Sequence, residues 1–572
     1  MTNEEVARLL DDIGDMLEIQ GENVFKVRAY HRAANSIRSL TADVKKLYEQ
    51  EKLAEIPGVG AHIAEKVAEL LRTGRLAYYG QLEKKVSPAM LTLMQVPSVG
   101  PKKAKTLYEK LHITSIDQLE KAAKAEKLRK LPGMSVKTEE NIIHDIELFR
   151  KHRERILLLE ALPIAERIVE DLRKQFFVDR ADMAGSLRRM KETIGDIDLL
   201  AASEQPDKVA DFFCSLSDVV RVLAKGKTKS SVVVRTGLQI DLRVVAPQEY
   251  GSALQYFTGS KEHSIRLRDI AKKKGLKISE YGIFEVKANK RLGGKTEEEI
   301  YEKLGIDFVP PALRENKGEV EAALEHRLPK LVELKDIKGD LHVHSKWSDG
   351  LSKTKDVAEV ALSLGYNYVA LCDHAEKLHI AGGMTLKEIQ KRAEEIRELN
   401  SKLKGLVVLA GVELNIDNEG NVDYGPEVLK DFDLVSASIH TGFGQSEKQL
   451  TERAIRAMNN EYIHVLCHPT GRILGKREPY KIDLEKVFDE AKATGTLLEL
   501  NSFPDRLDLK DDHLREAKKR GVRIAIGTDS HVANQLHYMR YGVATAQRGW
   551  LTKEEVVNTY PLAKLRKVLK KR

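Results

Sequence analysis

The chain has 572 residues, which is too long for a single hydrophobic core, so several domains are expected. Its 42% hydrophobic and 32% charged residues are typical of a globular protein, and no apolar run approaches the roughly 20 residues of a membrane-spanning helix. The 95 Lys and Arg residues against 87 Asp and Glu residues leave a charge of +8, which fits a phosphate-rich partner without identifying one.

The chain begins with an acidic, amphipathic segment, MTNEEVARLLDDIGDML, which has the pattern of neither a signal peptide nor a transit peptide. Its three cysteines, Cys214, Cys372 and Cys467, cannot form a paired disulfide framework and indicate a reducing compartment. Cys372 and Cys467 each lie beside a candidate metal ligand. Because Leu, Ala and Val surround them, we interpret both as buried strand residues.

The N-terminal part has helical periodicity and little strand character. Two segments, 55–71 and 95–111, share one pattern: an apolar residue, Pro, two further residues, Gly, and then an amphipathic helix. A third segment, 130–146, keeps the Pro but has Ser135 in place of the second Gly. The repetition predicts a recurring turn that leads into a helix.

Such turns expose backbone N–H groups at a helix start, where an anionic phosphate can bind. Lysines that follow the second turn add positive charge for a DNA backbone. A single Pro-Gly helix start is common in any fold, whereas repeated copies are typical of helix-hairpin-helix motifs that bind DNA without reading its sequence. The expected DNA-binding residues are Gly58, Gly60, Gly100, Lys102 and Lys103.

Strand and helix patterns alternate over residues 154–250, and three aspartates stand out there. Asp196 and Asp198 are two apart in an apolar run, so a strand would place both carboxylates on one face. Asp241, in the run QIDLRVV, can join them from a neighbouring strand. Three oxygen ligands on one sheet suit a pair of Mg²⁺ or Mn²⁺ ions that hold a triphosphate.

An Asp-x-Asp pair alone is common on exposed strands, so its surroundings decide its meaning. Gly185 and Ser186 at an expected turn, with Arg189 on the next segment, offer N–H, hydroxyl and guanidinium donors to phosphate oxygens. With a third aspartate downstream, the combination indicates a nucleotidyltransferase fold.

The order of these motifs resembles that of the family X DNA polymerases, to which animal DNA polymerase beta belongs. The resemblance covers about residues 1–310, and its motif residues are Gly185, Ser186, Arg189, Gly195, Asp196, Asp198, Asp241 and the run Tyr256-Phe257-Thr258-Gly259-Ser260. It implies a lyase-like domain, fingers, a palm and a thumb in that order.

The resemblance also implies roles for individual residues. The catalytic metal ligands would be Asp196, Asp198 and Asp241. The nucleotide-binding residues would be Gly185, Ser186, Arg189, Gly195, Tyr256, Phe257, Gly259 and Arg268. Ser186 and Arg189 would hold the triphosphate, residues 256–259 would lie under its sugar, and Arg268 would approach the template strand.

Two positions depart from polymerase beta. Lys261 and Ser264 stand where that enzyme has an Asp near the incoming base and an Asn that reads the minor-groove edge of the base. We therefore expect nucleotide selectivity to differ, while the catalytic aspartates are retained.

The resemblance extends to the deoxyribose-phosphate lyase of the family. Lys66 matches its Schiff-base lysine, and Lys26 and Tyr30 match supporting positions. His62 and Tyr78 replace two basic supports, and an amine nucleophile needs a lowered pKa or a nearby base. A solvated helix lysine explains Lys66 equally well, so lyase activity stays open.

Six apolar, strand-like runs in the last third of the chain end in metal-ligand residue types. They lie at 341–344, 369–374, 409–413, 436–440, 465–469 and 526–531. One His at a strand end is usually structural, but six repetitions indicate a single convergent metal site. The candidate ligands are His342, His344, Asp349, His374, Glu413, His440, His468, Asp529 and His531.

One zinc ion takes about four ligands, so nine candidates indicate two or three ions. The nitrogen-rich set suits Zn²⁺, Mn²⁺ or Fe²⁺ better than Mg²⁺, and such ions activate water for attack on phosphorus. Ligands at successive strand ends fit a barrel, whose functional residues collect at one face. Arg472, which follows His468 closely, is a candidate for binding substrate phosphate.

The order HxH, D, DH, E, H, HP, DxH resembles the PHP (polymerase and histidinol phosphatase) domain over about residues 337–572. It implies a (β/α)7-type barrel and metal-dependent phosphoester hydrolysis. We thus predict a multidomain α+β and α/β protein. Its expected parts are a lyase-like helical domain at 1–85, fingers at 86–153, a nucleotidyltransferase palm at 154–250, a thumb at 251–315, a linker at 316–336 and the PHP domain at 337–572.

A family X polymerase fused to a PHP domain resembles the bacterial and archaeal family X enzymes. That resemblance implies gap filling by the polymerase, and a Mn²⁺-dependent 3′–5′ exonuclease that often also cleaves at abasic sites. We therefore expect a cytoplasmic, nucleoid-associated DNA repair enzyme that acts on gapped or primed DNA with deoxynucleoside triphosphates. No coiled-coil pattern supports an oligomer, so a monomer is the default. Two alternatives are a small-molecule phosphatase with a relict polymerase and a non-catalytic protein that bridges DNA ends.

Overall fold

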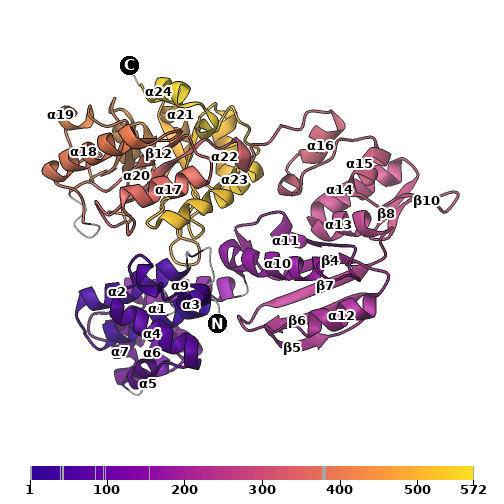
Figure 1. Cartoon of the computed structure of the whole chain (residues 1–572), viewed down its shortest axis with the longest axis horizontal. Helices are drawn as coiled ribbons and strands as arrows, with labels where there is room; N and C mark the ends of the chain where they lie inside the picture. Colours follow the sequence, from indigo (N-terminus) through magenta and orange to yellow (C-terminus); the bar gives the residue numbers. More distant parts are fainter. Residues whose placement is uncertain are drawn as a thin grey trace.

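The computed structural model describes residues 3–38, 40, 44–83, 85–94, 96, 98–153, 155–376 and 382–570. In Figure 1 the helical N-terminal part (indigo) lies below the C-terminal barrel (orange to yellow), and the palm and thumb lie to the right of both. No helix in these described ranges is long and apolar enough to cross a membrane.

The N-terminal part is entirely helical. Its elements are α1 (Asn3–Ile19), α2 (Val24–Arg38), α3 (Val44–Glu49), η1 (Leu53–Glu55), α4 (Ala61–Thr73), α5 (Ala77–Glu83), α6 (Pro88–Met94), α7 (Pro101–Leu111), α8 (Ile116–Lys124), η2 (Leu128–Lys130) and α9 (Val136–Arg153). One hydrophobic cluster runs from Val6 to Ile146, so the regions predicted as lyase-like domain and fingers share a core.

The repeated turns lead into helices as predicted. Gly60 and Gly100, both with extended backbone, immediately precede α4 and α7. Gly58 adopts the left-handed conformation (φ +78°), which glycine tolerates without strain. Pro101 occupies the first turn of α7, where its missing N–H would have no helical partner.

The palm is a five-stranded sheet in the order β2-β4-β7-β6-β5, with β4 and β7 parallel and the other neighbours antiparallel. The elements of this part are β1 (Ile156–Leu157), α10 (Leu158–Arg173), β2 (Arg180–Met183), α11 (Gly185–Arg188), β3 (Thr193–Ile194), β4 (Ile197–Ala202), α12 (Pro206–Cys214), β5 (Val219–Ala224), β6 (Lys229–Val234) and β7 (Gln239–Val245).

The thumb contains a three-stranded antiparallel sheet, β8-β9-β10, and helices. Its elements are α13 (Tyr250–Thr258), α14 (Lys261–Lys273), β8 (Leu276–Ser279), β9 (Gly282–Glu285), β10 (Lys290–Gly293), α15 (Glu297–Leu304), η3 (Pro311–Leu313) and α16 (Glu319–Leu324). The segment predicted as a linker holds α16, whose Val320 and Ala323 are buried in the thumb cluster with Leu267. This segment is therefore packed against the thumb along part of its length.

The C-terminal part is a seven-stranded, all-parallel sheet in the order β11 to β17. A parallel bridge between Val343 and Ser530 joins its two ends, which gives the predicted (β/α)7-type barrel. Its elements are η4 (Leu334–Asp336), β11 (Gly339–Val343), α17 (Thr354–Ser363), β12 (Tyr368–Leu371), α18 (Leu386–Lys402), β13 (Val407–Asn415), α19 (Pro426–Leu429), β14 (Leu434–Ser438), α20 (Glu447–Met458), β15 (Val465–Leu466), α21 (Leu484–Thr494), β16 (Leu497–Asn501), α22 (Asp511–Lys519), β17 (Ile524–Gly527), η6 (Ala533–Tyr538), α23 (Met539–Arg548), η7 (Val557–Thr559) and α24 (Leu562–Leu569).

The barrel strands are buried on both faces, which explains their continuous apolar sequences. Along β12, Val369 and Leu371 belong to one hydrophobic cluster, whereas Tyr368, Ala370 and Cys372 belong to another. Polar residues that follow these strands are thereby held at the carboxyl end of the barrel.

Two candidate metal centres and a candidate lyase site

The palm strands bring the three predicted aspartates together. Asp198 on β4 lies directly opposite Asp241 on β7 in the parallel register, and Asp196 immediately precedes β4. The parallel pairing of β4 and β7, two inner strands that are far apart in sequence, thus builds one carboxylate cluster near the beginnings of these strands.

The cluster concentrates negative charge. Burial, reinforced by the neighbouring carboxylates of Asp196 and Asp241, raises the pKa of Asp198 to about 6. Burial alone would also raise the pKa of Asp241, but hydrogen bonds from Lys229 and other neighbours lower it below its usual value. The Lys229 Nζ atom lies 2.6 Å from Asp241 Oδ2. A site that resists holding all three negative charges is suited to divalent cations, which neutralise them.

Gly185 is required by the approach of the Asp198 side chain. Its φ is +59°, and a Cβ atom at this position would lie 2.2 Å from Asp198 Oδ2. Ser186 follows in the short helix α11. Gly185 therefore packs directly against the Asp198 carboxylate, and the predicted binding of phosphate by the Gly-Ser pair stays a prediction.

Arg189, a predicted triphosphate ligand, is engaged by protein groups. Its Nε donates to Glu315 Oε1 at 3.0 Å, and its Nη1 donates to the Thr258 carbonyl oxygen at 2.5 Å. Arg548 of α23 donates at 3.0 Å both to the Arg189 carbonyl oxygen and to Glu315 Oε1. A triphosphate bound by Arg189 would have to compete with Glu315.

The predicted sugar-binding segment packs on the palm. The rings of Tyr256 and Phe257 meet edge to face with centroids 5.1 Å apart, and the Arg243 guanidinium lies 4.2 Å from the Phe257 centroid. A Cβ on Gly259 would be 3.3 Å from Arg189 Nη1. Arg268 donates to the Ser264 carbonyl oxygen on its own helix, α14, so its approach to a template stays a prediction.

The candidate lyase residues lie close together on the N-terminal part. Lys66 Nζ is 5.0 Å from the Tyr78 ring centroid and donates to the His62 carbonyl oxygen at 3.2 Å. Tyr78 also stacks on Tyr30, with centroids 6.3 Å apart. A hydrogen bond to Glu22 raises the pKa of Lys26. Lys66, Tyr30 and Tyr78 thus lie close together, and lyase activity stays a prediction.

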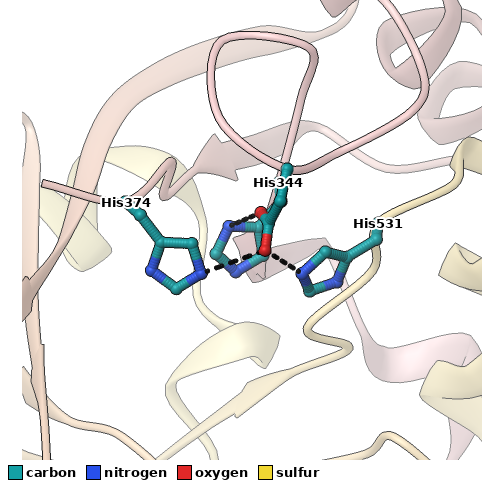
Figure 2. Close-up of side chains that lie close together, drawn as sticks. His344, His374 and His531 are labelled. Carbon is teal, nitrogen blue, oxygen red and sulfur yellow. Dashed lines mark ion pairs between the residues drawn. The ribbon is translucent and has the colours of Figure 1, made fainter. Parts of the chain in front are cut away.

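The nine candidate ligands of the barrel converge at the carboxyl ends of its strands. Figure 2 shows His344, His374 and His531 close together. Asp349 belongs to the same candidate metal-binding group as these three histidines. The nitrogen–oxygen distances to Asp349 are 3.7, 3.5 and 3.3 Å, respectively.

Glu413 links the remaining ligands. Its Oε2 lies 3.0 Å from His374 Nδ1, and its Oε1 lies 3.0 Å from His468 Nε2 and 3.3 Å from His440 Nε2. On the other side, Asp529 Oδ1 is 3.1 Å from His344 Nε2. The candidate ligand groups overlap through His342, His344 and His374, and the number of ions that they hold stays a prediction.

The electrostatics of the barrel site favour positive charge. Burial alone would lower the pKa values of His374 and His531, but the carboxylates of Glu413 and Asp349 raise them to about 10 and about 9. Neighbouring histidines hold the pKa of the buried Glu413 carboxyl well below its usual range, against the effect of burial. Divalent cations would replace these protons.

The donor set also fits resident metal ions. Within the described parts of the chain, the buried Nδ1 atoms of His344 and His468 have no hydrogen-bond partner. His342 Nε2 and His344 Nε2 are only 3.1 Å apart, an arrangement that a shared cation would stabilise. These nitrogens are therefore available as ligands.

Sequence reasoning missed two groups that orient ligands. Glu499 Oε1 lies 2.5 Å from His342 Nδ1, and its Oε2 accepts from the His468 backbone N–H at 2.7 Å. Asn415 Oδ1 lies 2.7 Å from His440 Nδ1. Contacts of this kind fix the ring orientation of metal-binding histidines. Glu499 lies within the apolar run LLEL (497–500) on β16, which among the described barrel strands is the one without a predicted ligand, and a carboxylate in such a run was a usable signal.

Two further sequence interpretations can be compared with the structure. Cys467 is 1% exposed within an apolar cluster, and burial raises the pKa of its thiol well above the usual value, so the predicted burial is confirmed. The residue lies immediately after β15 and not in the strand. Its sulfur nevertheless lies within reach of His342 and Glu499. Arg472, predicted as a phosphate ligand, instead donates to Glu192 of the palm and to the Leu507 carbonyl oxygen.

Comparisons with known families match four parts of the chain. A helix-hairpin-helix domain matches residues 1–76, and a SAM-like helix-hairpin-helix tandem matches residues 90–147. The DNA polymerase beta thumb matches residues 253–315, and the PHP domain matches residues 340–503.

Individual relatives cover either the whole chain or its C-terminal part. The DNA polymerase/3′-5′ exonuclease PolX of Bacillus subtilis is 35% identical over 573 residues, which is 100% of both chains. A probable phosphatase of Thermoanaerobacter sp. is 30% identical over 244 residues, 41% of this chain and 94% of the relative. A probable phosphatase of Syntrophotalea carbinolica is 32% identical over 229 residues, 38% of this chain and 90% of the relative.

Proposed function

The chain belongs to the PolX family of DNA polymerase/3′-5′ exonucleases, and we propose that it fills gaps in DNA and trims 3′ ends from two separate active sites. The palm performs template-directed nucleotidyl transfer, and the PHP barrel hydrolyses DNA phosphodiesters. Together these activities suit DNA repair, because a gap can be filled and an unsuitable 3′ end removed by one protein.

In the palm, the 3′-hydroxyl oxygen of a primer attacks the α-phosphorus of a deoxynucleoside triphosphate, and pyrophosphate leaves. Two Mg²⁺ or Mn²⁺ ions would activate the hydroxyl and neutralise charge on the transferring group. Asp196, Asp198 and Asp241 would hold them, with Asp241 nearest to the primer hydroxyl. Lys229, which forms an ion pair with Asp241, offsets part of the charge of this carboxylate.

In the barrel, water attacks the terminal phosphodiester, and a mononucleotide leaves. Two or three Mn²⁺, Zn²⁺ or Fe²⁺ ions would supply the activated water and charge neutralisation. The nine ligands would hold these ions, while Glu499 and Asn415 fix the orientation of His342 and His440. The same site would cleave beside abasic sites when such a sugar enters.

The observation that carries the proposal is that one chain brings together two separate clusters of candidate metal ligands. A 5′-labelled primer on gapped DNA tests it, with Mn²⁺ and with or without deoxynucleotides. Extension with nucleotides and shortening without them would support both activities. Extension without shortening would indicate that the barrel acts on another substrate. Shortening without extension would indicate that the palm only binds DNA.

The phosphatase relatives favour one other candidate, a small-molecule phosphatase that carries a relict polymerase. The intact aspartate cluster and the helix-hairpin-helix turns argue against it. Faster hydrolysis of histidinol phosphate than of labelled DNA would support this alternative. For the repair enzyme, we further propose a nucleoid-associated, monomeric protein in the cytoplasm.

A further inference from the structure

A cleft of about 620 Å³ separates the N-terminal helix α2 from the mouth of the barrel. The metal ligands Asp349, Asp529 and His531 line one side, and Arg28 and Arg32 line the side formed by α2. The two parts touch nearby, because a Cβ on Gly58 would lie 3.2 Å from Leu351 Cδ1. The polymerase half therefore forms a wall of the entrance to the PHP site.

Arg28 and Arg32 are placed to meet a ligand in this cleft. They are four residues apart on α2, so their side chains share one face of the helix. Both are exposed, and neither side chain forms an ion pair or hydrogen bond with any residue that the structure describes. The candidate lyase residue Lys26 is two residues from Arg28, on a different face, where it pairs with Glu22.

A third arginine approaches the same cleft from the barrel. Arg506, in the loop after β16, lies 3.5 Å from Asp529 Oδ2 through its Nε. Its buried Nη1 has no hydrogen-bond partner among the described residues. Cationic groups on opposite walls of a cleft that ends at a metal cluster suit an extended, multiply charged anion.

We propose that Arg28 and Arg32 bind the phosphates of a DNA single strand whose 3′ end enters the PHP site. This inference rests on the proposed exonuclease function and adds that the N-terminal part supplies the DNA-binding wall of that site. In a strand held there, the phosphates upstream of the scissile bond contact α2, and the terminal phosphodiester lies at the nine-ligand cluster. A small phosphodiester has no upstream phosphates and would not need the two arginines.

The test compares two substrates in the full-length, Mn²⁺-loaded protein. For the double variant Arg28→Ala/Arg32→Ala, kcat/KM for shortening a 5′-labelled single strand should fall about tenfold, mainly through KM. Hydrolysis of thymidine 5′-(p-nitrophenyl phosphate) should be unchanged. The slope of log KM against log salt concentration should decrease by about 1.4, since each lost single-strand phosphate contact removes about 0.7.

Two controls separate charge from structure. Arg72→Ala removes an exposed arginine in α4, away from the cleft, and should leave the kinetics of both substrates and the salt slope unchanged. Arg28→Lys/Arg32→Lys keeps the charges and should retain most of the salt slope. Equal loss of activity on both substrates, or an unchanged salt slope in the alanine variant, would overturn the inference.

Failure of the proposed function would look different. A wild-type protein that does not shorten the strand would refute exonuclease activity. Binding of a fluorescent single-stranded oligonucleotide would still test the arginines: weaker binding by the double variant than by Arg72→Ala would support the inference, and equal binding would overturn it.

Discussion

Arg472 of the barrel and Glu192 of the palm form an ion pair that joins the two enzymatic halves. The Arg472 Nη2 atom donates to Glu192 Oε2 at 2.8 Å, and Nη1 donates to Oε1 at 3.3 Å. The barrel residues Tyr538 and Tyr541 also belong to the hydrophobic cluster of the palm. The palm and barrel therefore pack as one unit.

The first prediction concerns this ion pair. Arg472→Ala should lower the free energy of unfolding of the palm–barrel unit by about 1–3 kcal/mol, because the Leu507 carbonyl oxygen also loses its donor. Glu192→Gln should cost at most about 1 kcal/mol, since Glu192 is partly exposed and solvent screens its charge. Scanning calorimetry measures both effects. A lower affinity for DNA in Arg472→Ala, with no loss of stability, would instead support phosphate binding by Arg472.

The second prediction concerns the close packing of Gly185. Gly185→Ala should lower primer extension by about 10²-fold, because the new Cβ displaces the Asp198 carboxylate and misplacement of reacting groups by about 1 Å has this effect. Gly237→Ala is the matched control: its φ is also positive (+85°), but a Cβ there meets no atom within 4 Å. Similar losses in both variants would show that backbone strain, not the carboxylate, is responsible.

The third prediction concerns Glu499 as a positioning residue. Glu499→Ala should weaken metal binding at the barrel site by about 10–100-fold, because His342 loses the group that orients its ring. Added Mn²⁺ should largely restore DNA shortening. Metal binding should weaken less in Glu499→Gln, because the side-chain oxygen of Gln still accepts a hydrogen bond from the His342 ring. Metal content and activity across a Mn²⁺ titration measure this. A loss that saturating Mn²⁺ does not restore would contradict it.

The fourth prediction concerns pH and the packing of α1 on α2. A hydrogen bond with Asp11, at 3.0 Å, raises the pKa of His31 above its usual value of 6.5. Protonated His31 therefore stabilises the folded state below pH 6.5, and this contribution is lost as pH rises through the raised pKa. Asp15, whose pKa burial raises to about 6, is already ionised in that window.

Hydrogen exchange of the α1 amides at several pH values, corrected for intrinsic rates, measures this loss. Opening of α1 should become easier from pH 6.5 upward in the wild type. Because Gln does not titrate, His31→Gln should flatten the pH dependence of α1 opening. An identical pH dependence in both proteins would assign the effect to another group.

Much of both metal centres could be predicted from sequence because strand geometry is local. The spacing of Asp196 and Asp198 predicted two neighbouring carboxylates, and Asp196 does act on Asp198, although it immediately precedes β4 and does not lie in the strand as expected. Most of the nine barrel ligands lie within a buried strand or a few residues after one, and parallel strands gather their carboxyl ends at one face.

Other features depend on pairings that no local pattern encodes. Lys229 reaches Asp241 because β6 pairs with β7, and a single lysine on a strand carries no signal of that contact. The engagement of Arg189 by Glu315 and of Arg472 by Glu192 requires the packing of the barrel on the palm and thumb. The cleft beside α2 likewise arises between parts that are more than 300 residues apart in sequence.

The central claim is that two independent metal sites act within one chain, and two variants on one substrate test it most directly. On gapped DNA with a 5′-labelled primer and Mn²⁺, Asp198→Ala should reduce extension by about a thousandfold or more, because metal ligation contributes several kcal/mol to the transition state. The same variant should shorten the primer as fast as the wild type. His344→Ala should abolish shortening and retain extension. Loss of both activities in either variant would contradict the account.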